Sequence, residues 1–184
     1  MGLPNFRPGR LWLDHWRWRV GSRDWFPLVL LLALLVLLVL LILFVQSARA
    51  QAERERAVRC LALNVYHEAR GESRAGQLAV AQITLNRVAS PRFPDDVCAV
   101  VFEKRWDRLR GRYVAAFSWT ELSPDTDRSS RAWRQSLAVA REALEGAGDP
   151  RLEGALFYHA RHIRPSWARR KQLVARIGRH RFYR

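Results

Sequence analysis

The stretch "AVRCLALNVYHEARGES", residues 57–73, carries the pattern on which the expected fold depends. Its apolar residues recur at the spacing of one face of an α-helix: Val58, Leu61, Ala62, Val65 and Ala69. Gly71 follows as a typical helix end. Positions 61, 65, 68 and 72 are spaced by four, three and four, so Glu68 and Glu72 continue the apolar face. We therefore expect these two carboxyl groups to point toward the interior or a cleft.

A second helix is predicted directly downstream. Ser73 can cap its N-terminus, and Ser90-Pro91 ends it. One apolar stripe contains Leu78, Ala81, Leu85 and Val88, whereas Val80 and Ile83 form another. A helix that is apolar on two sides is expected at the centre of the domain.

Two further helices follow from capping residues and periodicity. Asp95 or Asp96 is expected to cap a short helix through Val101. Ser129 or Ser130 is expected to open a longer helix that carries Trp133 on its apolar stripe and closes at Gly146.

The β content is predicted to be small. "GALFYHA", residues 154–160, and the C-terminal "HRFYR" read as a hairpin-like pair of strands, whereas residues 104–127 read as irregular. The expected fold class is mainly α (α+β), a helical domain with a minor β element.

The N-terminal quarter predicts a membrane segment. The chain has 184 residues, and residues 26–45, "FPLVLLLALLVLLVLLILFV", contain no charge. Twenty helical residues span roughly 30 Å, the hydrocarbon thickness of a bilayer. Arginines and tryptophans precede the segment, so the positive-inside rule places residues 1–25 in the cytoplasm.

We therefore predict four regions: a basic cytoplasmic arm (1–25), a transmembrane anchor (26–45), a linker (46–56) and an exported domain (57–184). The expected location is the bacterial inner membrane, with a single pass and the domain on the periplasmic or extracytoplasmic side. Cleavage after Ala50, in "SARAQ", is the alternative, but the apolar region is longer than that of a usual signal peptide.

The two cysteines of the chain, Cys60 and Cys98, lie in the exported domain. Disulfides persist in oxidising compartments, so we expect these residues to form one. Two buried free thiols are the alternative.

Glu68 is the candidate catalytic residue. A pair of surface acids that contact Arg70 or Arg74 is the simpler interpretation, but the helix phase argues against it for Glu68. A carboxyl group in a partly apolar cleft has a raised pKa and keeps its proton near neutral pH. A general acid that protonates a glycosidic oxygen needs this property.

Several segments, in order, resemble the cell wall hydrolase family of the spore-cortex-lytic enzymes. They are "YHEARGES" (66–73), "GQLAVAQITLNRV" (76–88), "FPDDVCAVVF" (93–102), "FSWT" (117–120) and "GALFYHA…RPSW". The resemblance covers residues 57–184. It implies a lysozyme-like fold related to lytic transglycosylases.

The resemblance also implies an activity and a catalytic residue. The first glutamate of the "EARGE" run, Glu68, matches the family's catalytic glutamate. Family members cleave peptidoglycan glycan strands, either by hydrolysis or by an intramolecular transfer that leaves an anhydro sugar. This chemistry needs no metal or cofactor. The membrane anchor replaces the separate wall-binding domain of many spore enzymes, so we expect a role in envelope remodelling.

Other residues are assigned supporting roles. Glu72 is expected to support Glu68, and Trp119, Tyr158 and His159 are candidates for a sugar-binding wall, with core packing as the alternative for the two aromatic residues. The irregular segment offers possible carboxylate partners: Asp107, Glu121, Asp125 and Asp127. Residues 161–184 contain nine Lys and Arg residues and no acid, a pattern of either an anion-binding or a simply solvated face.

Two rival functions remain open. A zinc-dependent peptidoglycan amidase or peptidase would draw its ligands from His67, Glu72, His159 and His162, but no H-E-x-x-H motif is present. The net charge of +15 also permits a non-enzymatic basic envelope or nucleic-acid-binding protein. The chain contains no nucleic-acid-binding motif, and the domain is expected to face away from the cytosol. We therefore expect no nucleic-acid partner.

Overall fold

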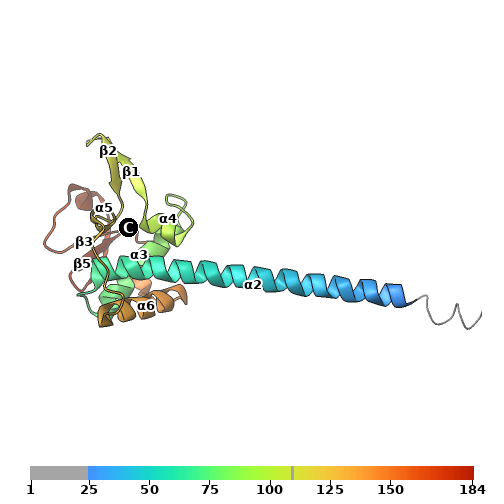
Figure 1. Ribbon diagram of the computed structural model, residues 1–184. Helices are drawn as coiled ribbons and strands as arrows, with labels where there is room; N and C mark the ends of the chain where they lie inside the picture. Colours follow the sequence, from blue (N-terminus) through green and yellow to red (C-terminus); the bar gives the residue numbers. More distant parts are fainter. Residues whose placement is uncertain (1–24, 109) are drawn as a thin grey trace, which may run out of the picture. The chain divides into compact units, whose positions relative to one another are not determined.

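The computed structural model describes residues 25–108 and 110–184, which divide into two compact units. The first unit extends to Gln51, and the second comprises Ala52–Arg184 (Figure 1). The helices are α2 (Phe26–Ala69), α3 (Arg74–Val88), α4 (Val97–Val101), α5 (Trp119–Leu122) and α6 (Arg131–Leu144), with short 3₁₀ helices η1 (Pro150–Leu152) and η2 (Ser166–Arg170). The strands are β1 (Lys104–Asp107), β2 (Arg112–Ala115), β3 (Phe157–Ala160), β4 (Leu173–Ile177) and β5 (His180–Tyr183). The prediction of a mainly helical fold with a minor β element is confirmed.

The first part of α2 is an apolar helix whose side chains are exposed. Its most apolar 18-residue window has a mean hydropathy of 3.8 and no buried residue. In the described part of the chain, α2 alone is long and apolar enough to cross a membrane, a test that an N-terminal signal sequence would also pass. The helix continues without a break through residues 46–56.

Three of the predicted helix caps are present in the structure. Ser73, Asp96 and Ser130 each accept a hydrogen bond from the backbone N–H three residues ahead, at 3.3, 2.8 and 3.1 Å. Each of these bonds satisfies a donor that the first turn of a helix leaves without a partner. The sequence therefore located the beginnings of α3, α4 and α6 correctly.

The centre of the domain is α3, which packs on two sides as predicted. On one side Ala81 joins a cluster that includes Leu61 and Val65 of α2 and Val139 of α6. On its other side α3 contributes to a second cluster, formed by Ala79, Ile83, Leu152, Ala155, Ala175 and Phe182. Two apolar faces therefore join the helical half of the domain to the sheet.

The sheet has the strand order β3-β5-β4, and both pairs are antiparallel. The predicted pairing of residues 154–160 with the C-terminus is confirmed, with Tyr158 opposite Phe182 and His159 opposite Arg181. The central strand β5 also pairs with β4, which the sequence analysis did not predict. The β4–β5 register shifts between Leu173 and Ala175, and burial along β4 does not alternate, so no period of two identifies this strand.

Residues 104–127 are more regular than predicted. β1 and β2 form an antiparallel hairpin that projects from the helical body, and the short helix α5 follows it (Figure 1). Each strand has four residues, none of which is fully buried, so no pattern of alternating burial could indicate it in the sequence.

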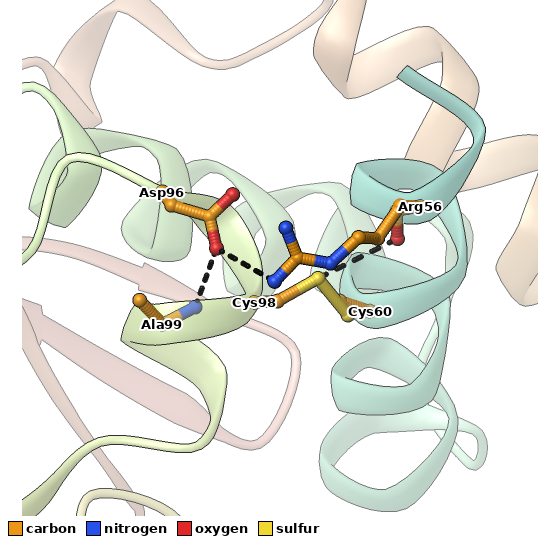
Figure 2. The surroundings of a disulfide bond; sticks show 5 residues. All are labelled: Arg56, Cys60, Asp96, Cys98 and Ala99. Carbon is orange, nitrogen blue, oxygen red and sulfur yellow. Dashed lines mark hydrogen bonds and ion pairs between the residues drawn. A yellow bond between two sulfur atoms is a disulfide. The ribbon is translucent and has the colours of Figure 1, made fainter. Parts of the chain in front are cut away.

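A disulfide joins Cys60 of α2 to Cys98 of α4, with Cα atoms 5.2 Å apart (Figure 2). An exposed ion pair lies beside it, in which Arg56 Nη2 is 3.5 Å from Asp96 Oδ1, and Asp96 also caps α4. Exposed ion pairs contribute little to stability, so the disulfide and the packing of Val97 and Val101 in the cluster that contains Leu61, and not this ion pair, connect the two helices.

Reduction of the Cys60–Cys98 bond should lower the free energy of unfolding by about 4 kcal/mol, because the closed loop of 38 residues restricts the unfolded chain. Urea unfolding with and without reductant measures this change. The double variant Cys60→Ser/Cys98→Ser should unfold like the reduced parent and should be insensitive to reductant. Rapid thiol labelling of the unreduced native protein would contradict the bridge.

Candidate active site

Glu68 lies in the last turn of α2, where it follows the fully buried residues Leu61 and Val65 on the same helix face. The side chain is half-buried, as the helix phase predicts. The turn at Arg70 and Gly71 then separates α2 from α3. The carboxyl group therefore occupies the position where the apolar stripe meets the end of the helix.

Tyr158 contacts Glu68 directly. Its hydroxyl group donates a hydrogen bond of 3.0 Å to Oε2 of Glu68. Burial raises the pKa of Tyr158 well above its ordinary value, and the charge of Glu68 adds to this effect, so the hydroxyl keeps its proton and acts as the donor. Strand β3 fixes the ring, which packs against His180 and Phe182 with centroid separations of 5.4 and 5.8 Å.

Burial raises the pKa of Glu68 above that of an ordinary glutamate. The hydrogen bond from Tyr158 and the positive charge of Arg87 act in the opposite direction, but burial prevails. The acid form of Glu68 is therefore retained to a higher pH. The Tyr158 hydroxyl and the charge of Arg87 stabilise the carboxylate that forms when the proton leaves.

Arg87 was not among the predicted site residues. It is buried on α3, where Nε donates a 3.0 Å hydrogen bond to the carbonyl of Leu156. Its guanidinium lies over the rings of Phe93 and Phe117, 5.4 and 5.1 Å from their centroids. In the sequence Arg87 is one arginine among many, and only its burial distinguishes it.

Glu103 is a second carboxylate that the prediction missed. Its side chain is 13% exposed, and Oε1 accepts a 2.6 Å hydrogen bond from Arg105. Oε2 is buried without a hydrogen-bond partner among the described residues. The charge of Glu103 acts on Arg87, which in turn acts on Glu68.

The four acids that the sequence offers as possible partners of Glu68 have local contacts. Asp107 accepts a hydrogen bond from the Arg110 backbone, and Glu121 accepts one from the Ala115 backbone. Asp125 and Asp127 similarly accept hydrogen bonds from backbone N–H groups within two residues. These contacts order the segment that leads into α6.

Trp119 lies against the same end of α2. Its indole N–H donates a 3.1 Å hydrogen bond to Asn64, and its ring stacks on His67 at a centroid separation of 4.6 Å. His67 also lies 2.9 Å from the hydroxyl of Thr126. Trp119 is thus fixed beside the residue that precedes Glu68.

His159 points the other way. Adjacent strand residues face opposite sides of a sheet, so Tyr158 and His159 are separated by the backbone of β3. His159 Nδ1 lies 2.8 Å from the carbonyl of Ala160, and Nε2 lies 2.9 Å from the hydroxyl of Tyr183. The structure therefore does not bring His159 together with Glu68.

The ligand set of the alternative zinc site is also dispersed. Within the described ranges, no three His, Cys, Asp or Glu residues are grouped closely enough to hold a metal ion. His67 and His159 are each occupied by the contacts described above, and Glu72 has an arginine partner.

Glu72 holds the turn between β4 and β5 against the junction of α2 and α3. Its side chain is 5% exposed and receives hydrogen bonds from the backbone N–H (2.9 Å) and the Nε (2.6 Å) of Arg179. Arg179 also donates to the carbonyl of Gly71 at 3.1 Å. Burial acts to raise the pKa of Glu72, but these contacts with Arg179 outweigh it, so the pKa lies below its ordinary value.

The simpler interpretation, in which the two glutamates contact Arg70 or Arg74, does not match the contacts of these arginines. Arg74 pairs with Glu142 of α6, and Arg70 lies over the ring of Tyr66, 5.0 Å from its centroid. The partner of Glu72 is instead Arg179, which is 107 positions away in the sequence.

Gly178 makes the contact between Glu72 and Arg179 possible. A Cβ atom at this position would lie 2.2 Å from Oε2 of Glu72, and the residue has a φ of +56°. Both the close approach and the left-handed backbone require glycine.

Gly178→Ala should therefore lower the free energy of unfolding by about 3 kcal/mol or more, because a steric clash adds to the backbone strain. Gly111→Ala is the matched control: its φ is +59° but nothing lies within 4 Å of the new Cβ, so it should cost only roughly 1–2 kcal/mol. In a Glu72→Ala background the cost of Gly178→Ala should fall to the control value. Equal costs for Gly178→Ala and Gly111→Ala in the parent, measured by urea unfolding, would contradict this account.

Comparisons with known proteins agree with this architecture. The family model described as Cell Wall Hydrolase matches residues 71–183, and Glu68 precedes the first matched residue. The spore cortex-lytic enzyme of Bacillus subtilis (strain 168) is 32% identical over 128 residues, which cover 68% of this chain and 36% of that protein. The enzyme of the same name from Halalkalibacterium halodurans is 33% identical over 125 residues, which cover 68% and 34%. The chain thus spans about a third of the length of these curated relatives.

Two solved structures share the fold. The catalytic domain of the Bacillus cereus SleB protein has 28% sequence identity and a TM-score of 0.56, covering 71% of this chain and 91% of that one. The catalytic domain of the germination-specific lytic transglycosylase SleB from Bacillus anthracis has 30% identity and a TM-score of 0.53, covering 70% and 93%. From the matched residues and the shared fold, the chain belongs to the cell wall hydrolase family.

Proposed function

We propose that this protein cleaves the glycan strands of peptidoglycan and that Glu68 is its general acid and base. The observation that carries the proposal is the half-buried Glu68 carboxyl, which has a raised pKa and accepts a hydrogen bond from Tyr158. Membership of the cell wall hydrolase family supports the choice of substrate.

The proposed reaction begins with protonated Glu68. The carboxyl group gives its proton to the glycosidic oxygen as that bond breaks, and positive charge develops on the sugar ring. The Tyr158 hydroxyl and the Arg87 charge then stabilise the carboxylate that remains. In the second step Glu68 removes a proton from the group that attacks the sugar, and the acid form is restored.

The attacking group is either water or the 6-hydroxyl of the same sugar. We favour the 6-hydroxyl, which yields an anhydro sugar and needs no carboxylate nucleophile. The description of one structural neighbour as a lytic transglycosylase supports this choice. The charge of Glu103 acts on Arg87 and thereby adjusts the electrostatics of the site. This role leaves Glu68 as the single catalytic carboxyl group.

We also propose that residues 26–45 anchor the enzyme in the inner membrane, with residues 1–25 in the cytoplasm and residues 57–184 outside it. The exposed apolar side chains of the first part of α2 support the anchor. The disulfide supports an oxidising location for the domain. A tethered domain would reach peptidoglycan close to the membrane, which suits envelope remodelling.

Glu68→Gln should reduce glycan cleavage by about a hundredfold or more, because the amide has no proton to transfer. Burial raises the folded-state pKa of Glu68, so its ionisation costs stability as the pH rises through that pKa. The variant should therefore be at least as stable as the parent at pH 7. Assays on purified peptidoglycan, with fragment masses to identify anhydro ends, measure the loss.

Glu53→Gln is the matched control for this variant, since Glu53 is an exposed glutamate on the same helix. It should retain full activity, and Glu72→Gln should lose less activity than Glu68→Gln. Near-native cleavage by a stably folded Glu68→Gln variant would show that another residue is the acid.

The anchor predicts that the full chain is recovered from the membrane only with detergent and begins at its own N-terminal arm. Cell fractionation followed by N-terminal sequencing checks both points. A soluble product that begins at Gln51 would mean that the segment is a cleaved signal peptide.

A further inference from the structure

The sheet face opposite Tyr158 carries polar and basic residues. On β3 and β5, Tyr158 and Phe182 are paired on the inner face, which packs against α3. The alternate pair, His159 and Arg181, therefore faces the other way. The segment that contains η2 contributes to this same outer side.

A cavity of about 560 Å³ lies on this outer side. Its lining residues come from β3, from the η2 segment and from β5: His159, Arg164, Pro165, Ser166, Ala168, Arg169, Arg181 and Tyr183. Small-molecule sites commonly have volumes of about 300–1,000 Å³, so the cavity can hold a ligand of several residues.

The charge of the cavity is strongly positive. Arg164, Arg169 and Arg181 line it, and no lining residue is acidic. The whole segment from 161 to 184 contains nine Lys and Arg residues and neither Asp nor Glu. Nε of Arg181 is buried without a hydrogen-bond partner among the described residues. A buried guanidinium donor without an acceptor is costly.

The uncharged wall of the cavity is held rigidly. A carbonyl oxygen can only accept, so His159 Nδ1–H donates to Ala160, and Nε2 lies 2.9 Å from the Tyr183 hydroxyl. The His159 and Tyr183 rings stack at a centroid separation of 5.3 Å, and Trp167 packs edge-on against both. The histidine therefore shapes the cavity, and the arginines supply the binding groups.

We propose that this cavity binds the carboxylate groups of an acidic peptide, namely the stem peptide of peptidoglycan. Guanidinium groups bind carboxylates through paired hydrogen bonds, and three arginines line this cavity. The cavity volume suits a short peptide better than a single small anion. The choice of this peptide rests on the proposed function.

The position of the cavity fits a branched substrate. β3 is an edge strand, with Glu68 bound by Tyr158 on one face and the cavity beside His159 on the other. A glycan strand at Glu68 can therefore send its peptide branch around the free edge of β3. The site would then favour peptide-bearing strands over bare glycan.

The test is the binding of free stem tetrapeptide, without glycan, to the full-length protein in detergent by isothermal titration calorimetry. The exposed residues Arg164 and Arg169 are changed together to Gln, and Arg181→Gln is made separately. The double variant should bind at least about tenfold more weakly, which corresponds to about 1.4 kcal/mol. Arg181→Gln should also weaken binding, and a carboxyl-amidated peptide should bind more weakly than the free acid.

Arg128→Gln/Arg131→Gln is the charge-matched control, because both residues are exposed and lie outside the cavity. It should bind the peptide like the parent. Equal peptide affinity of the Arg164/Arg169 double variant and the parent would overturn the proposal, as would inorganic phosphate binding in the absence of peptide binding. The assay contains no glycan, so its failure is distinguishable from a failure of Glu68 to cleave glycan.

Discussion

The hydrogen bond between Tyr158 and Glu68 joins the two halves of the domain at the point where a carboxyl group is buried. The apolar stripe of α2 forces Glu68 inward, because Leu61 and Val65 on the same face are completely buried. A carboxyl group in this position loses water and needs polar partners. Strand β3 supplies the Tyr158 hydroxyl and α3 supplies the charge of Arg87, so both halves must assemble before the site is complete.

Two glutamates four residues apart acquire opposite properties from their surroundings. Glu68 receives one hydrogen bond from a neutral donor, and burial raises its pKa. Glu72 receives two hydrogen bonds from Arg179, and its pKa falls although its side chain is only 5% exposed. Environments that separate the pKa values of neighbouring carboxyl groups also separate their roles. The first is suited to hold a proton, and the second is suited to remain a carboxylate that holds a turn in place.

Local patterns predicted much of the fold and little of the surroundings of Glu68. Helix periodicity and the caps Ser73, Asp96 and Ser130 located three helices because these signals act within a few residues. The short exposed strands β1 and β2 have no such signal. The burial of Arg87 and the pairing of Glu72 with Arg179 depend on segments that meet only in the folded chain, so no spacing in the sequence indicates them.

The central claim is that burial gives Glu68 a proton to donate, and a titration of that carboxyl group by carbon NMR tests it most directly. Comparison with Glu68→Gln assigns the signal. We predict a pKa above that of an ordinary glutamate, because burial outweighs the Tyr158 hydrogen bond and the Arg87 charge. Tyr158→Phe should raise the pKa further, since it removes a bond that stabilises the carboxylate. A Glu68 pKa at or below the ordinary value in the parent protein would contradict the account.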